Sequence, residues 1–522
     1  MNEQMQARIR AIFHRWQQGI CPGGQVLVRR GGQTVFEECF GYADVENQVP
    51  VTPETVFHAA SVSKQFTVML VLLLCQEGLV ELEGDIRRYV PQYLATDSPI
   101  TVHDLMSNCS GLRDLFELQD LMGISNDDLT SQNFVLKLNA RQKEVNFPAR
   151  SRFSYCNTNF SLLAAIAEAV TGKPFPQLLR ERILMPLGME HSQVCDRYWL
   201  RIPGRACSYT DDGTVFHYNP LLYGIYGGTC LNTTARDLAR WMENYRSCLV
   251  CSPETVRLMS TPTQLKDNAP TTYGCGLWGG EKEGLRYFMH VGEDAGFRSI
   301  TLRLPEEDVD VVILSNTDNT YTEDSAWRIV RILLELPEKE APALPTGGPL
   351  KSLSEAAGFY YASLPSSGIF VITEREGQLF LRQKYGLAPL TPVENRLYRL
   401  GRQEVYFLLG EDGPRYISPE GTVALTKAQD APVSPELARR CVGRYLSPEL
   451  DAVYTVTFED GTLYLEQLRR GKTPLHPVEG GRFVTEYARS CFVAFQLPED
   501  GPASGLTLSG VRVSALPFTR LS

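Results

Sequence analysis

The stretch "HAASVSKQFTVMLVLLLCQ", His58 to Gln76, decides the fold of the N-terminal part of the chain. From Phe66 to Leu74 it is apolar apart from Thr67, and methionine and leucine, which favour helices, dominate it. This composition predicts a helix buried on all sides, and one too short to cross a bilayer, which takes about 20 apolar residues. Two serines and a lysine stand at the entrance of this buried helix.

Ser61 and Lys64 share one face of the predicted helix, because three steps of about 100° leave them about 60° apart. Ser63 lies about 200° from Ser61, so Ser61 is the hydroxyl that should pair with the lysine. A simple N-cap is the alternative role for Ser61, although a capping box has Glu or Gln where this chain has Lys64. The helix dipole and burial both disfavour a cation here. Such conditions are typical of a lysine that takes a proton from a neighbouring hydroxyl.

Composition excludes several classes of function. The 522 residues are 43% hydrophobic, enough for two to four domains, and the formal net charge of −10 is spread without blocks of like charge. We therefore expect neither nucleic acid nor an anionic membrane as a partner. Thirteen scattered cysteines without zinc-site spacing favour a reducing compartment and no metal or cofactor. The first 19 residues have helical spacing and no signal-peptide pattern, so we expect a cytoplasmic location.

Two proline-rich stretches divide the chain. They predict a large N-terminal domain, a linker and two small tails, at residues 1–336, 337–350, 351–430 and 431–522. The tails look like copies: Gly377-Gln378-Leu379-Phe380-Leu381 matches Gly461-Thr462-Leu463-Tyr464-Leu465. A turn glycine between alternating β-branched and aromatic residues indicates a hairpin, so we expect two small antiparallel β-barrels.

The N-terminal part, residues 1–336, contains both the alternation typical of strands and the spacing typical of helices. It predicts a hairpin that turns at Gly31-Gly32, a helix ended by Gly172, and two strands within residues 299–316 followed by an amphipathic helix. Strands at both ends with helices between them predict an α+β fold whose antiparallel sheet has edges from distant sequence.

Two further stretches could complete an acyl-transfer site. In "RFSYCNTNF", Tyr155 and Asn157 should point the same way in an extended loop, the phenol as a base beside Lys64 and the amide as a ligand for a substrate carbonyl. In "YFMHVGEDAGFRS", His290 should lie in a strand, and Gly292 should allow another backbone to approach. A packed tyrosine and a packed histidine are the alternatives.

Three motifs thus follow one another: Ser61-Val62-Ser63-Lys64, Tyr155-Cys156-Asn157 and His290-Val291-Gly292. Their order and surroundings, over about the first 330 residues, resemble the penicillin-recognising serine hydrolases. That superfamily includes class C β-lactamases, DD-peptidases, esterases and D-aminopeptidases. Asn108-Cys109-Ser110-Gly111-Leu112 departs from the family's usual His-Thr-Ser-Gly-Leu, which should affect packing more than chemistry.

The resemblance implies catalytic roles for Ser61 as nucleophile, Lys64 as proton acceptor and Tyr155 as proton shuttle, with His290 in the place of a β-lactamase lysine. It implies substrate binding by Asn157, Gly292 and the residues after it, with an oxyanion hole from the N–H groups of Ser61 and Glu293.

The sequence indicates the substrate less clearly than it indicates the catalytic residues. Glu293 and Asp294 would repel a substrate carboxylate and favour a free amine. The two lipocalin-like barrels resemble the D-aminopeptidase branch, which implies that a loop of the last barrel enters the active site; residues 469–483 are the candidate. Spacers or oligomer contacts are an equal alternative for the barrels.

We therefore expect a serine peptidase or amidase that takes a small molecule or short peptide. An esterase or β-lactamase of the same fold is the first alternative, and a ligand-binding protein without turnover is the second. A homodimer is left open.

Overall fold

The computed structural model describes residues 1–125, 128–337, 350, 352–362, 369–383, 386–401, 405–410, 413–418, 421–428, 432–478, 481–487 and 489–521. The predicted linker, 337–350, lies outside the described residues except at its two ends. In the described part, we find no helix whose length and apolar character would suffice for a membrane crossing.

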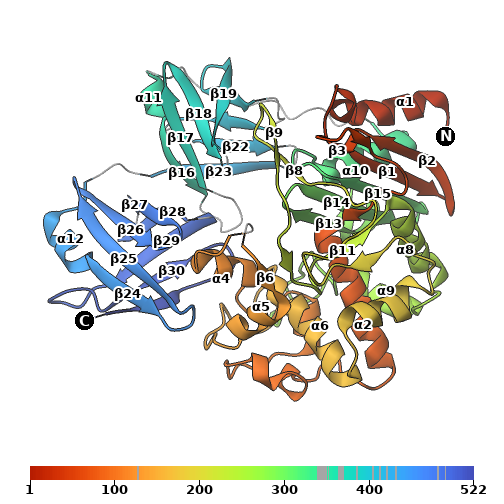
Figure 1. Ribbon diagram of the computed structural model, residues 1–522, viewed down its shortest axis with the longest axis horizontal. Helices are drawn as coiled ribbons and strands as arrows, with labels where there is room; N and C mark the ends of the chain where they lie inside the picture. The colour runs from red at the N-terminus through yellow and green to blue at the C-terminus, as the bar shows by residue number, and fades with distance from the viewer. Residues whose placement is uncertain are drawn as a thin grey trace.

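A six-stranded antiparallel sheet organises the N-terminal part, residues 1–337 (Figure 1). Its order is β12 (Trp278–Lys282), β13 (Leu285–Asp294), β14 (Phe297–Leu304), β15 (Val309–Ser315), β1 (Gly24–Arg30) and β2 (Gln33–Phe40). The predicted hairpin is confirmed, with Gly31 and Gly32 both at positive φ. The edges β12 and β2 come from distant sequence, as expected of the α+β fold.

Alternation along the strands gives the sheet two buried faces. Val26 and Val28 of β1 pack with α1 (Glu3–Ile12) and α10 (Thr322–Leu333) on one face. Leu27 faces the other side, toward the helical half of the N-terminal part. A strand in which successive residues are all buried needs this double cover.

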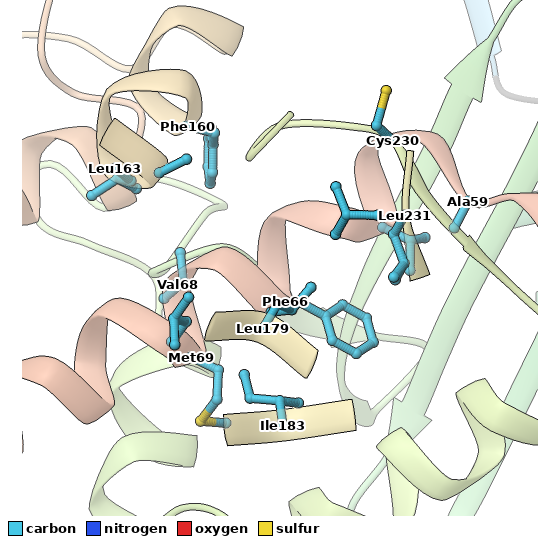
Figure 2. Close-up of a cluster of buried hydrophobic side chains, with 14 of the residues drawn as sticks. Ala59, Phe66, Val68, Met69, Phe160, Leu163, Leu179, Ile183, Cys230 and Leu231 are labelled. Carbon is cyan, nitrogen blue, oxygen red and sulfur yellow. The ribbon is translucent and has the colours of Figure 1, made fainter. Parts of the chain in front are cut away.

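The helical half surrounds α2 (Ser63–Gln76), the predicted buried helix. Phe66 and Met69 of α2 lie beside Leu179 and Ile183 (Figure 2). Val68 belongs to the same apolar cluster as Leu163 of α6 (Asn157–Thr171). All six side chains are essentially inaccessible to solvent. Apolar contacts on every side explain why a helix with so little amphipathic character is stable here.

The other helices of this half are α3 (Val102–Met106), α4 (Leu115–Leu121), α5 (Gln132–Asn139), α6 (Asn157–Thr171), α7 (Phe175–Leu179), α8 (Ala235–Ser247) and α9 (Pro253–Ser260). Short helical turns are η1 (His14–Gln17), η2 (Ala60–Val62), η3 (Ile86–Arg88), η4 (Pro91–Tyr93) and η5 (Arg180–Leu184). Short strands are β3 (Tyr42–Asp44), β4 (Val49–Pro50), β5 (Phe57–His58), β6 (Thr130–Ser131), β7 (Gln193–Val194), β8 (Tyr209–Asp211), β9 (Phe216–Tyr218), β10 (Tyr223–Gly224) and β11 (Leu231–Thr233).

Two closed antiparallel barrels of eight strands each follow, as predicted (Figure 1). The first barrel is preceded by α11 (Leu353–Ala356) and consists of β16 (Gly358–Ala362), β17 (Ile369–Arg375), β18 (Gln378–Gln383), β19 (Gly386–Glu394), β20 (Leu397–Leu400), β21 (Tyr406–Leu408), β22 (Arg415–Ser418) and β23 (Gly421–Lys427). The second is preceded by α12 (Pro435–Cys441) and consists of β24 (Gly443–Ser447), β25 (Ala452–Glu459), β26 (Thr462–Gln467), β27 (Gly471–Val478), β28 (Arg482–Tyr487), β29 (Arg489–Gln496), β30 (Gly505–Ser509) and β31 (Leu516–Arg520).

The second barrel packs directly on the helical half. Leu118 and Leu121 of α4 and Leu138 of α5 belong to the apolar cluster that fills this barrel. A buried ion pair joins Arg113 Nη1 to Glu449 Oε2 at 2.6 Å. These contacts fix the loops of the second barrel relative to the start of α4.

Candidate active site

Ser61 and Lys64 meet at the entrance of α2. Lys64 Nζ donates to Ser61 Oγ at 2.9 Å, whereas Ser63 Oγ donates to Ala60 O at 2.6 Å and accepts from Leu231 N at 3.1 Å. The prediction that Ser61 and not Ser63 pairs with the lysine is confirmed. Ser61 lies in the 3-10 turn η2 rather than in the α-helix, but side chains three residues apart also align in a 3-10 turn.

The residue before Ser61 is held in a strained conformation. Ala60 has φ of 47°, in the left-handed region that a residue with a Cβ rarely adopts. The hydrogen bond from Ser63 to the Ala60 carbonyl helps to hold this turn. Ser63 thus shapes the backbone that presents Ser61.

Lys64 is fully buried among three oxygen acceptors. Besides Ser61 Oγ, its amine donates to Asn157 Oδ1 at 2.8 Å and to Gly228 O at 2.7 Å. Burial lowers the pKa of Lys64 to about 7; the carboxylate of Asp114 opposes this shift and the guanidinium of Arg512 adds to it. A neutral amine is therefore well populated at neutral pH, and it can accept a proton from Ser61.

Tyr155 completes a group of three around the serine hydroxyl. Lys64 Nζ lies 4.8 Å from the centre of the Tyr155 ring, and the phenol hydrogen-bonds with Ser61. Burial raises the pKa of Tyr155, against the influence of the Ser61 hydrogen bond and the Arg512 charge. The phenol therefore stays protonated in the resting state, as a group that donates a proton to a leaving group must be.

Asn157 lies between the lysine and a buried carboxylate. Its Oδ1 accepts from Lys64, and its Nδ2 donates to Asp114 Oδ2 at 2.8 Å. We predicted an extended loop for this residue, which is wrong: Asn157 is the first residue of α6, and Cys156 is its N-cap. Asp114 caps α4 and also accepts from the Asn157 backbone N–H at 2.7 Å. It was not among the predicted site residues, because in the sequence it looks like an ordinary helix cap.

His290 lies in β13, as predicted, and is completely buried. Its Nδ1 is 2.6 Å from Val291 O, so this nitrogen carries the hydrogen, and Nε2 accepts from the hydroxyl of Tyr273 at 3.0 Å. Burial, with the nearby charge of Lys64, lowers the pKa of His290 to about 3. The neutral ring lies with its centre 6.2 Å from that of Tyr155.

Gly292 allows the close approach that the sequence suggested. A Cβ built on it would lie 2.4 Å from Ala59 O and 3.1 Å from Ser61 N. Any side chain would therefore push β13 away from the turn that presents Ser61. The backbone of Glu293, one residue on, is in this way held close to the serine.

The two acidic residues after Gly292 lie in different surroundings. Glu293 is exposed. Asp294 Oδ2 instead accepts from the hydroxyls of Tyr223 and Thr229 and is 3.0 Å from His58 Nε2. The carboxylate of Asp294 is therefore largely engaged inside the protein, and Glu293 is the freer of the two.

A loop of the second barrel reaches this site, but it is not the predicted one. Residues 510–515, between β30 and β31, place the guanidinium of Arg512 4.9 Å from the centre of the Tyr155 ring. The predicted stretch, 469–483, whose residues 479–480 lie outside the described residues, contacts the helical half elsewhere. There Arg469 pairs with Asp128, beside a cavity of about 420 Å³, and Arg470 pairs with Asp120.

The cysteines and acidic residues offer little for a metal. All thirteen cysteines are free thiols. Within the described ranges, no three His, Cys, Asp or Glu side chains are grouped so as to hold a metal ion.

Known proteins resemble this chain in sequence and in fold. A D-aminopeptidase of Brucella ovis is 27% identical over 449 residues, which are 85% of this chain and 82% of that protein. An octameric penicillin-binding protein homologue from Pyrococcus abyssi has a TM-score of 0.58 and 23% identity, covering 81% of this chain and 99% of that one. A D-amino acid amidase from Ochrobactrum anthropi SV3, complexed with L-phenylalanine amide, has a TM-score of 0.54 and 22% identity, covering 64% of this chain and 99% of that one.

A family model described as Beta-lactamase matches residues 9–335. This match includes all three motifs and the whole six-stranded sheet. Since it spans more than half of the sequence, the chain belongs to the Beta-lactamase family.

Proposed function

We propose that this serine hydrolase removes the N-terminal residue, preferably a D-residue, from short peptides and amino-acid amides through an acyl-enzyme on Ser61. The observation that carries the proposal is the fully buried Lys64, with a pKa of about 7, at 2.9 Å from Ser61 Oγ. The D-aminopeptidase of Brucella ovis, which aligns with most of the chain, supports the substrate class.

The proposed mechanism uses the contacts of the amine. Neutral Lys64 keeps two N–H donors, which satisfy Asn157 Oδ1 and Gly228 O, and turns its lone pair to Ser61 Oγ. Ser61 then attacks the substrate carbonyl while its proton passes to Lys64. Tyr155, which is hydrogen-bonded to Ser61, passes a proton to the departing amine. Water then attacks the acyl-enzyme carbonyl: Tyr155 takes a proton from the water, and Lys64 returns its proton to Ser61 as the Ser61–acyl bond breaks, which restores the resting enzyme.

The remaining roles follow from position. The N–H groups of Ser61 and Glu293 would bind the oxyanion, since Gly292 holds β13 against the serine. Asn157 would bind the carbonyl side of the substrate. Neutral His290, bonded to Tyr273 and the Val291 carbonyl, would orient the aromatic groups beside Tyr155. We propose that the loop at 510–515 shortens the cleft, which suits short substrates.

The test compares p-nitroanilides of D-Ala, L-Ala and Gly with p-nitrophenyl acetate and penicillin. We expect the fastest turnover for the D-Ala anilide, and Ser61→Ala should reduce that turnover by about 10³-fold or more. The fluorophosphonate should add its mass to Ser61. Ser63→Ala should keep most of the activity, with some loss of stability. Turnover of p-nitrophenyl acetate or penicillin without turnover of any anilide would contradict the peptidase assignment. A Ser61 that carries no fluorophosphonate would favour a binding protein.

A further inference from the structure

The backbone of Arg512 is held by several hydrogen bonds, and its side chain lies over the ring of Tyr155. Its carbonyl accepts from Asn146 Nδ2 at 2.8 Å and from Asp114 N at 3.3 Å, and its own N–H donates to Glu117 Oε2 at 2.5 Å. Ser514 N donates to Asn146 Oδ1 at 2.8 Å. The loop that carries Arg512 is thus fixed to the helical half on both sides of the arginine.

The guanidinium itself is only partly used. It lies over the Tyr155 ring, its Nη1 is 3.9 Å from Asp114 Oδ2, and 28% of the side chain is exposed. That carboxylate oxygen already accepts two shorter bonds from Asn157. Among the residues that the structure describes, the guanidinium donates no hydrogen bond, although it has five N–H donors.

The charges around Arg512 leave it available to an anion. Asp114 is bonded to Asn157 and to the backbone of α4, and Lys64 is also cationic when protonated. Glu293 is close enough to influence Tyr155 but is exposed. A fixed guanidinium with open donors is the group that binds a carboxylate by two parallel hydrogen bonds.

We propose that Arg512 binds a carboxylate of the substrate, carried by the side chain of the residue that acylates Ser61. This inference rests on the proposed function. Arg512 lies beside Asp114, which holds Asn157, the proposed ligand of the acyl part. The preferred N-terminal residue is therefore acidic, and its α-amine is free to approach Glu293.

The test uses two isosteric substrates, the p-nitroanilides of D-Glu and D-Gln. In the unmodified protein we expect kcat/KM to favour D-Glu by about ten- to a hundredfold, the range for a charge-assisted hydrogen bond. Arg512→Gln should reduce that ratio to about one, mainly through KM, and Arg512→Lys should restore part of it. The matched control is Arg469→Gln, another second-barrel arginine paired with a carboxylate of the helical half, which should leave the ratio unchanged.

A second pair of substrates locates the carboxylate. If Arg512 binds the C-terminal carboxylate of a dipeptide instead, Arg512→Gln will reduce the preference for D-Ala-D-Ala over its amide and leave the D-Glu ratio alone, which overturns the side-chain assignment. Equal turnover of the D-Glu and D-Gln anilides, or a D-Glu to D-Gln ratio of kcat/KM that is unchanged in Arg512→Gln, would overturn the proposal. Arg512 would then serve only to dock the loop. Failure of the protein to hydrolyse any anilide overturns the proposed function together with this inference.

Discussion

Each of the two barrels contains a hydrogen bond of the same kind. In the first, the hydroxyl of Tyr360 donates to Ala356 O at 2.9 Å; in the second, that of Tyr445 donates to Cys441 O at 2.6 Å. Both join the first strand of a barrel to the short helix before it. In the sequence a glycine stands two residues before each of these tyrosines, Gly358 in the first tail and Gly443 in the second, so the similarity of the tails extends to a repeated structure.

The surroundings of the two barrels differ. The first approaches the N-terminal part at a turn, where a Cβ built on Gly401 would lie 3.0 Å from the Cα of Gly213. The second shares its apolar core with α4 and α5, pairs Glu449 with Arg113, and places Arg512 at Tyr155. Of these two similar barrels, the described residues therefore place the second against the candidate site, and its docking on the helical half makes the difference.

Breaking the buried ion pair of the second barrel should have the largest effect. Glu449→Ala leaves the Arg113 guanidinium buried without its partner, and we expect a loss of about 3–5 kcal/mol in the free energy of unfolding. Activity should fall as well, because the same interface holds the loop of Arg512. Denaturant unfolding and anilide turnover measure the two effects.

Asp451→Asn is the matched control for that change, because asparagine removes the charge and tolerates the left-handed backbone at this position, where φ is 57°. Asp451 lies two residues away in the same barrel and pairs with Arg141 at 3.7 Å, but both side chains are mostly exposed. Solvent-exposed pairs contribute little, so no measurable change is expected. Equal losses in the two variants would contradict a special role for the buried pair.

The pH dependence of activity tests whether only the second barrel acts on the site. Ser61 needs neutral Lys64, so kcat/KM should fall about tenfold per pH unit below about 7. The positive charge of Arg512 lowers the pKa of Lys64, so Arg512→Gln should move this acid limb to higher pH. Arg399→Gln, at an exposed position of the first barrel, should leave it in place. A limb that does not move in Arg512→Gln would contradict electrostatic contact between the second barrel and the lysine.

Local patterns predicted most of the fold. The glycine pair of the first hairpin, the αL cap at Gly172 and the apolar run of α2 each carry their signal within a few residues. The pairing of Ser61 with Lys64 was predictable for the same reason, since it depends only on spacing along one helical turn.

The entry of Arg512 into the site could not be predicted in this way. Residues 510–515 connect β30 to β31, whereas most of 469–483 forms the strand β27. Both stretches contain glycine, and nothing within either sequence indicates which one faces the serine. That choice depends on how the barrel docks, through Leu118 and the Arg113–Glu449 pair. Contacts between residues hundreds of positions apart leave no local periodicity to detect.

The smallest expected effect tests the equivalence of the two barrels. Tyr360→Phe and Tyr445→Phe each remove one hydroxyl from a buried hydrogen bond to a helix carbonyl, at a cost of about 1 kcal/mol in the free energy of unfolding. The bond to the helix carbonyl is the same in both copies, but Tyr360 also accepts from Gly410 N and Tyr445 from Arg520 Nη1. The two losses should therefore agree within about 1 kcal/mol. Anilide turnover should drop more for Tyr445→Phe, since among the described residues the second barrel contacts the site through Arg512. A loss several times larger in one barrel would show that the shared hydrogen bond has acquired a different structural role in the two copies.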